Sequence, residues 1–122
     1  MLKVESRNLG EVAFLCMQGQ IVNGETETLR HAVQSQRDAS TVVLDLSRVS
    51  IVDARGLGAM LELREQAQSK GISFKLMNVG KLVGRVLEVT RLDSVFEVTS
   101  GVEFFPVSRR SPVSAARLAS CA

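Results

Sequence analysis

The chain has 122 residues, of which 45% are hydrophobic and 23% charged, a composition that excludes disordered and fibrous classes and allows one buried core. Three of the fifteen basic residues lie in residues 107–122, where no acid occurs, so the rest of the chain carries twelve bases and thirteen acids. This near-neutral body lacks the basic stripe that neutralises phosphates, and we expect no binding to nucleic acid.

Hydrophobic periodicity predicts a strand pair and a helix in the N-terminal third. Residues 2–5 alternate between apolar and charged side chains, as in a half-exposed strand. A turn signal at residues 8–10 separates them from residues 11–18, which form a more continuously apolar strand, so the two are expected to pair as a hairpin. After a loop, one apolar face over residues 25–37 predicts the first helix.

The second half alternates strands and helices. Residues 41–46 are β-branched and almost wholly apolar, which is typical of a central strand buried on both faces. A helix is predicted over residues 56–70, because apolar residues recur along one face and a lysine and a glycine end it. Residues 72–76 alternate as a further strand, residues 82–87 have the spacing of a third helix, and residues 92–98 are expected to add an edge strand.

Helices that alternate with buried strands favour parallel pairing through right-handed crossovers. The sequence therefore predicts a single α/β domain over residues 1–106, with a mixed central sheet of four to five strands. We expect an antiparallel hairpin at its N-terminal end and three to four helices mainly on one side. Residues 102–105 are predicted to form a last helical turn, and residues 107–122 a flexible basic tail.

The segment over residues 43–61 carries the most informative pattern of the chain. Its strand ends in the letters DLS at residues 45–47, and a predicted short loop follows with the apolar pair Ile51 and Val52. The letters DARGLG then occupy residues 53–58, where the helix is expected to begin.

This pattern resembles the STAS domain family, of the anti-sigma-factor antagonist type. The signature of that family is Asp-x-Ser after a strand, then an apolar pair and Asp-Ser-Ser-Gly-Leu-Gly at a helix start. The resemblance extends over residues 2–105, with GQIV at residues 19–22 and VLEVTRLD at residues 86–93 as corroborating stretches. It implies a STAS-like fold.

The resemblance also implies a partner. In the family, a kinase-like anti-sigma factor binds the surface around this helix start and phosphorylates the second serine of the motif. Here Arg55 stands at the phosphoacceptor position, Ala54 replaces the first serine, and Val22 stands where the family has an aspartate. Because arginine has no hydroxyl group, we expect the usual phosphorylation switch to be absent. Ser47 and Ser50 are kept as alternative phosphoacceptors.

The predicted partner-binding surface consists of the helix start and the apolar residues that follow it, namely Asp53, Ala54, Arg55, Gly56, Leu57 and Met60. Leu57 and Met60 are expected at its apolar centre and Arg55 in its polar rim. Asp53 is expected to cap the helix and to hold Arg55 in a salt bridge. A cation at a helix N-terminus costs about 0.3–1 kcal/mol. Arg55 therefore indicates either selection for an acidic partner or a drifted surface residue, and both interpretations stay open.

These features predict an anti-sigma-factor antagonist that binds an anti-sigma factor and so frees a sigma factor. An accessory subunit of a membrane lipid-transport ATPase and a scaffold component in stress signalling are the alternatives. The letters GLG at residues 56–58 lack the lysine and hydroxyl of a phosphate-binding loop, and no metal-ligand spacing occurs. No convergent acid, base and nucleophile are found, so we expect no enzyme activity, no cofactor and no metal. A weak homodimer stays open.

The chain has no run of about 18 apolar residues, so we expect no membrane insertion. Its first residues, MLKVE, are charged and lack the apolar stretch of a secretory signal. A cytoplasmic location is therefore expected.

Overall fold

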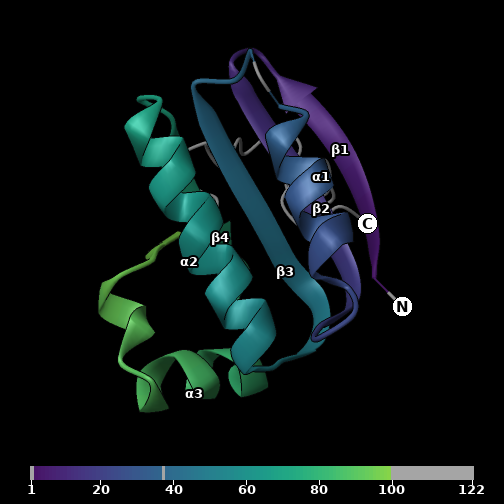
Figure 1. Cartoon of the computed structure of the whole chain (residues 1–122), viewed down its shortest axis with the longest axis vertical. Coiled ribbons are helices and arrows are strands. Elements are labelled where there is room, and N and C mark those ends of the chain that lie inside the picture. The colour runs from purple at the N-terminus through teal and green to yellow at the C-terminus, as the bar shows by residue number, and fades with distance from the viewer. Residues whose placement is uncertain (1, 37, 100–122) are drawn as a thin grey trace, which may run out of the picture.

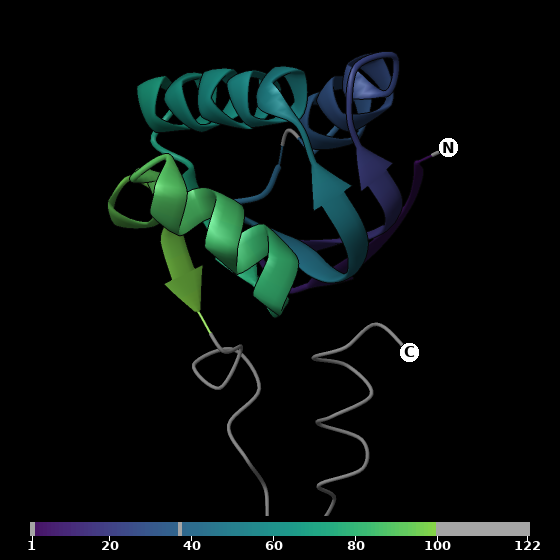
Figure 2. The same ribbon diagram turned by 90° about the horizontal axis from the view of Figure 1, so that it is seen from below.

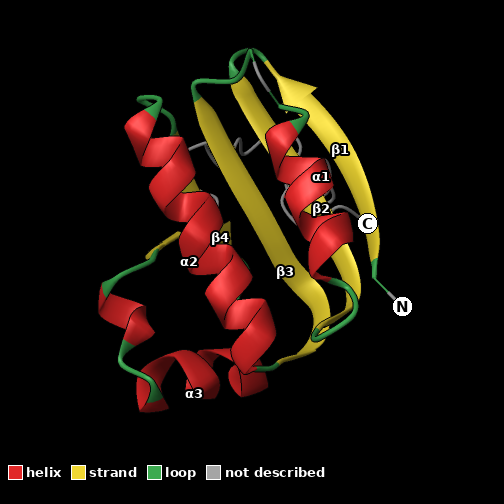
Figure 3. Cartoon of the chain, in the orientation of Figure 1, coloured by secondary structure: helices red, strands yellow, loops and turns green. Residues whose placement is uncertain are grey.

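The fold alternates strands and helices after an opening hairpin. A computed structural model describes residues 2–36 and 38–99. In chain order (Figures 1 and 3) the elements are β1 (Lys3–Leu9), β2 (Val12–Ile21), α1 (Thr26–Gln34), β3 (Thr41–Val52), α2 (Ala54–Ser69), β4 (Ser73–Met77), α3 (Lys81–Val89), the 3₁₀ turn η1 (Leu92–Ser94) and β5 (Glu97–Thr99). The helical turn predicted at residues 102–105 and the tail predicted at residues 107–122 lie outside the described residues.

The strands form one mixed sheet in the order β1-β2-β3-β4-β5. β1 and β2 are antiparallel, with Lys3 opposite Gln18 and Leu9 opposite Val12, whereas β2 to β5 run parallel. Gly10 makes the hairpin turn with a φ of +62°, a conformation that residues with a side chain rarely adopt. The predicted mixed sheet with an N-terminal antiparallel hairpin is confirmed.

Two helices cover one face of the sheet. Figure 2 shows α1 and α2 side by side above the strands, and α3 away from this pair. The guanidinium of Arg30 in α1 joins the two helices through an ion pair of 2.8 Å with Glu62 in α2. α3 packs against β3 and buries Val83 and Leu87. The arrangement agrees with the predicted α/β class, since each helix turns an apolar stripe towards the sheet.

The core lies mainly between the sheet and the helices. Residues 42–46 of β3 are all buried, as predicted for a central strand. Leu44 belongs to the large cluster shared with α1 and α2, whereas Val43 belongs to a smaller cluster with Phe14 and Met77. Neighbouring residues of a strand face opposite sides of the sheet, so β3 is buried on both faces. Each such aliphatic side chain contributes about 1.5–3 kcal/mol through removal from water.

Four predicted boundaries were wrong. β3 continues through residues 47–52, where a loop was predicted, and β2 continues to Ile21. Residues 47–52 remain a strand because they pair with the extended β2, with Val49 opposite Gly19 and Val52 opposite Ile21 after register shifts in the ladder. α2 begins at Ala54, two residues earlier than predicted, and the segment predicted as an edge strand opens with the turn η1 before β5.

Candidate functional site

The start of α2 is held in place by the carboxylate of Asp53. Asp53 has an extended backbone and its Oδ1 accepts a hydrogen bond of 2.8 Å from the backbone N–H of Gly56, which makes it the N-cap. Its Oδ2 accepts a second hydrogen bond, of 3.0 Å, from the backbone N–H of Asn23 in the loop after β2. The backbone N–H of Asp53 donates to the carbonyl of Ile21 at 3.2 Å. One residue therefore ties the helix start to the end of β2.

Gly56 lies at the closest approach between α2 and β2. A Cβ atom on Gly56 would lie 1.9 Å from the carbonyl oxygen of Ile21, a distance that real contacts do not reach. Gly58, two residues later in the same GLG stretch, has open space around its Cβ position. The two glycines of the GLG stretch therefore differ: the first is required by packing, and the second is exposed and unconstrained.

Ala54 and Arg55 are exposed on the first turn of α2. The predicted salt bridge between Arg55 and Asp53 is absent, because the carboxylate of Asp53 is engaged by backbone N–H groups, and no ion pair involves Arg55 within residues 2–36 and 38–99. The N–H groups of Asn23 and Gly56 hold the pKa of Asp53 below its ordinary value of 3.8, whereas partial burial acts in the opposite direction and Arg55 adds a smaller lowering. Within the described part of the chain, the exposed Arg55 guanidinium therefore has no ion-pair partner.

The apolar centre predicted for this surface is wrong. Met60 is 0% exposed and Leu57 only 7%, and both belong to the core cluster between α2 and the sheet. Gly56 is buried as well. Of the six residues predicted to bind a partner, only Asp53, Ala54 and Arg55 reach the surface.

Ile51 supplies exposed apolar surface that the prediction missed. Its side chain is 41% exposed, while Val52 beside it is buried, because successive residues of a strand point to opposite faces. The apolar pair Ile51-Val52 could have indicated this exposure. Because neighbouring residues of a strand point to opposite faces, only one member of the pair can be buried on a given face. Ile51 lies two residues before the cap Asp53, at the end of β3 that leads into α2.

Ser47 and Ser50 are exposed residues of β3 and not of a helix start. The hydroxyl of Ser50 donates to the carbonyl of Gly19 at 3.3 Å, and the backbone N–H of Ser47 donates to Asp45 at 2.9 Å. Neither serine therefore lies at the N-terminus of α2, where free backbone N–H groups favour a negative charge.

Loss of the cap should reveal itself in the pH dependence of stability. We expect Asp53→Ala to lower the melting temperature by several degrees at pH 7, because two backbone N–H groups lose their acceptor. A carboxyl whose pKa is lowered by folding stabilises the fold above its unfolded pKa, and this contribution is lost as the pH falls through the folded value. The difference in melting temperature between the native protein and Asp53→Ala should therefore stay constant above pH 3.8 and become smaller below it.

Thermal unfolding followed by circular dichroism over a pH series measures this gap. Asp53→Asn is the matched variant, since its carbonyl oxygen keeps one acceptor but carries no charge. It should melt between the other two proteins at pH 7. An unchanged gap at every pH would show that the carboxylate charge contributes nothing.

Comparison with known proteins agrees with this architecture. The family model of the STAS domain matches residues 3–106, and the chain belongs to the STAS domain family. The chain is similar in structure to an anti-sigma factor antagonist from Mycobacterium paratuberculosis, with a TM-score of 0.73 and 19% identity over 96% of this chain and 95% of the other. It is similar also to the anti-sigma factor antagonist SpoIIAA in its unphosphorylated form, with a TM-score of 0.69 and 15% identity over 84% and 92% of the two chains.

A third similar structure comes from another class. It is a sulfate transporter family protein from Wolinella succinogenes, with a TM-score of 0.68 and 17% identity over 95% of this chain and 93% of the other. At these identities the likenesses establish the fold. In the described part of the chain, no helix is long and apolar enough to span a membrane. The same residues contain no group of three or more His, Cys, Asp or Glu side chains placed to hold a metal ion.

Proposed function

We propose that this protein is an anti-sigma-factor antagonist, a regulatory module of the cytoplasm that binds a kinase-like anti-sigma factor and so frees a sigma factor. The observation that carries the proposal is the start of α2, where Arg55 is an exposed cation that has no ion-pair partner within residues 2–36 and 38–99, on a helix end held by two hydrogen bonds to Asp53. Family membership and the two antagonists of similar fold support it. The protein acts here by binding and not by catalysis.

The binding surface consists of Ile51, Ala54 and Arg55, and Asp53 lies beneath it as its support. Ile51 contributes apolar area and Ala54 allows close approach of the partner, since its side chain is only a methyl group. Arg55 contributes a planar group with five donors, which suits a bidentate pair with a carboxylate of the partner. A cation at this helix end destabilises the free protein, so the favourable contribution of Arg55 arises in the complex with the partner. The partner surface is therefore acidic.

Regulation by phosphorylation at the usual position has no acceptor in this chain, because Arg55 lacks a hydroxyl group. The amount of the protein, or competition between partners, then sets how much anti-sigma factor is occupied. Ser47 and Ser50 are the alternative acceptors, and a phosphate on either would act from β3 and not from the helix end.

A second candidate function is that of an accessory subunit of a membrane transport ATPase for lipids, with the same helix end facing a nucleotide-binding subunit. The similarity to a sulfate transporter family protein favours a transport-associated role as the alternative. A scaffold component of a stress-signalling assembly is the third, and the identity of the captured partner distinguishes all of them.

The test compares the native protein with Arg55→Glu. Reversal of the charge should weaken binding of the anti-sigma factor at least about tenfold, because an attractive pair becomes a repulsive one. The same substitution should raise the free energy of unfolding by about 0.3–1 kcal/mol, because an acid suits a helix N-terminus. Opposite changes in stability and in binding separate an interface residue from a residue needed for folding.

Tagged protein is used to capture partners from the cell extract of the source organism, and mass spectrometry identifies them. The affinity of the captured partner is then measured by calorimetry. Arg7→Glu, an equal charge reversal on the exposed strand β1, is the matched control and should leave binding unchanged. Equal affinity of the native protein and Arg55→Glu would refute the interface, and recovery of a transport ATPase would replace the proposed partner with the alternative one.

A further inference from the structure

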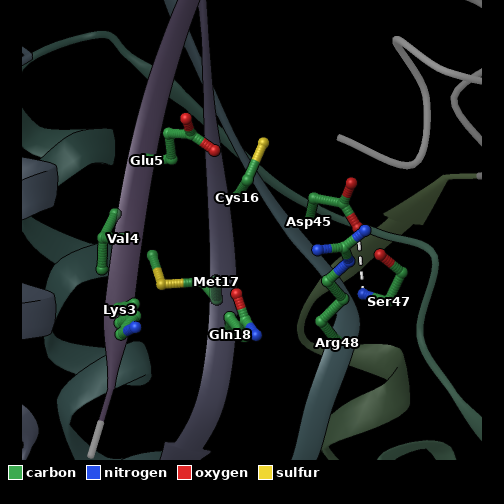
Figure 4. A pocket seen from close by; sticks show the side chains of 9 residues that line it. All are labelled: Lys3, Val4, Glu5, Cys16, Met17, Gln18, Asp45, Ser47 and Arg48. Atoms are coloured by element: carbon green, nitrogen blue, oxygen red, sulfur yellow. Dashed lines mark hydrogen bonds between the residues drawn. The ribbon is translucent and has the colours of Figure 1, made fainter. Parts of the chain in front are cut away.

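The register of β1, β2 and β3 places several charged side chains next to one another on the face of the sheet opposite α1 and α2. Pairing places Glu5, Cys16 and Asp45 in one row across β1, β2 and β3, and the next row contains Lys3, Gln18 and Arg48. These side chains line a pocket of about 430 Å³ (Figure 4). Val4 and Met17, their neighbours along the strands, pack against the main core, as expected from the alternation of a strand.

Asp45 is the buried charged residue in the lining of this pocket, and its hydrogen bonding is incomplete. It is 1% exposed, and its Oδ1 accepts from the backbone N–H of Ser47 at 2.9 Å and from the Asn78 side-chain amide at 3.4 Å (Figure 4 shows the former). Its Oδ2 is buried and has no hydrogen-bond partner among the residues that the structure describes. Buried polar atoms are almost always paired, and leaving one unpaired carries its full cost of desolvation. A hydrogen-bond acceptor that has no donor and belongs to a residue lining a pocket indicates that a bound ligand supplies the donor.

The charges around Asp45 restrict what that ligand can be. Lys3, Glu5 and Arg48 are exposed side chains, and within residues 2–36 and 38–99 neither they nor Asp45 form an ion pair. A simple cation that approaches Asp45 meets Lys3 and Arg48, and a simple anion attracted by these two meets Asp45. A small molecule with a positive donor next to a negative group satisfies both.

We propose that this pocket binds a small zwitterion whose ammonium lies next to its carboxylate, as in a free α-amino acid. The ammonium donates a hydrogen bond to Oδ2 of Asp45, and the carboxylate accepts from the guanidinium of Arg48. Charge-assisted hydrogen bonds of this kind are about twice as strong as neutral ones. None of residues 53–60 lines the pocket, so the site is separate from the proposed partner surface. A ligand would thus reach the protein through a different face.

Titration of the ¹⁵N-labelled full chain, followed by amide NMR shifts, tests the site. The probes are the common L-amino acids, added one at a time, and glycine betaine is compared with glycine. Betaine has the same two charges but no N–H donor. We expect saturable shifts at the amides of Gln18, Ser47 and Arg48 with a dissociation constant of about 1 mM or lower for at least one amino acid. Betaine should bind at least about tenfold more weakly than the best amino acid.

Two variants assign the contacts. Asp45→Asn keeps an acceptor for the Ser47 amide but removes the charge and one acceptor, and it should weaken binding at least about tenfold. Arg48→Gln, at an exposed position, should weaken it comparably and keep the melting temperature of the native protein. Arg55→Gln, on the separate surface, should bind the probe unchanged.

The proposal is overturned if no probe gives saturable shifts, if betaine binds as well as the amino acids, or if Arg48→Gln retains native affinity. The betaine comparison and Arg48→Gln keep the test decisive if Asp45→Asn does not fold. Capture of an anti-sigma factor is a separate measurement, so either proposal can fail without the other.

Discussion

Gly56→Ala should lower the free energy of unfolding by about 3 kcal/mol or more, since overpacking against rigid atoms lies at the upper end of such costs. The added Cβ atom would meet the carbonyl oxygen of Ile21 at 1.9 Å and the carbonyl carbon at 2.8 Å. These are backbone atoms of a paired strand, and the same oxygen accepts the N–H of Asp53. Relief therefore requires that α2 move away from β2, which breaks the attachment of its N-terminus.

Gly58→Ala is the matched control, because it makes the same chemical change one half-turn further along the helix. Apart from its chain neighbours and the backbone of its own helix, no atom of the described residues lies within 4 Å of its Cβ position. Alanine is favoured over glycine in a helix by about 0.5–1 kcal/mol, so this variant should be more stable than the native protein. Urea unfolding followed by circular dichroism measures both. Equal effects of the two substitutions would refute the close approach of α2 and β2.

Met60→Ala should cost about 2–5 kcal/mol of unfolding free energy, the range for truncation of a large buried side chain. Met60 is fully buried in the cluster between α2 and the sheet, and its truncation leaves a cavity in a close-packed core. If the interpretation of Met60 as a surface contact were right, the same substitution would leave stability nearly unchanged and weaken partner binding.

Leu82→Ala is the control for this prediction. Leu82 is 58% exposed on α3, and its truncation should change the unfolding free energy by less than about 0.5 kcal/mol. Chemical unfolding curves of both variants measure these changes in the free energy of unfolding. A small effect of Met60→Ala would show that the helix face assigned to the core is accessible to solvent.

Local patterns were enough to predict the sheet. The apolar run at residues 42–46 identified the central strand, and alternation with turn glycines identified the hairpin. The end of β3 was not predictable in this way, because its Ser-Arg-Val-Ser stretch has turn-forming residues. Its strand conformation depends on pairing with Gly19 and Ile21, thirty residues away in the sequence. Local strand propensity does not predict contacts between residues so far apart in the sequence.

The local geometry of the start of α2 was predicted in part. The cap at Asp53 follows from residue type alone, since an acid before a helix accepts backbone N–H bonds. Leu57 and Met60 were placed correctly on the apolar face of α2, but periodicity identifies such a face without saying what covers it. Here the covering layer is the protein's own sheet. The charged pocket escaped prediction entirely, because Lys3, Gln18 and Arg48 meet only through the register of three strands.

The way in which the N-terminus of α2 is attached to β2 affects how the sequences of proteins with this fold can diverge. Stability at this end depends mainly on Asp53 and Gly56, whose contacts are with the backbone. The exposed side chain of Arg55 forms no ion pair among the described residues and contributes only a small lowering of the pKa of Asp53. Exchange of a solvent-exposed helical residue typically changes stability by less than about 0.5 kcal/mol. A substitution at position 55 alone therefore leaves the architecture intact, and under the proposed function it would change the partner surface of a duplicated copy in a single mutational step.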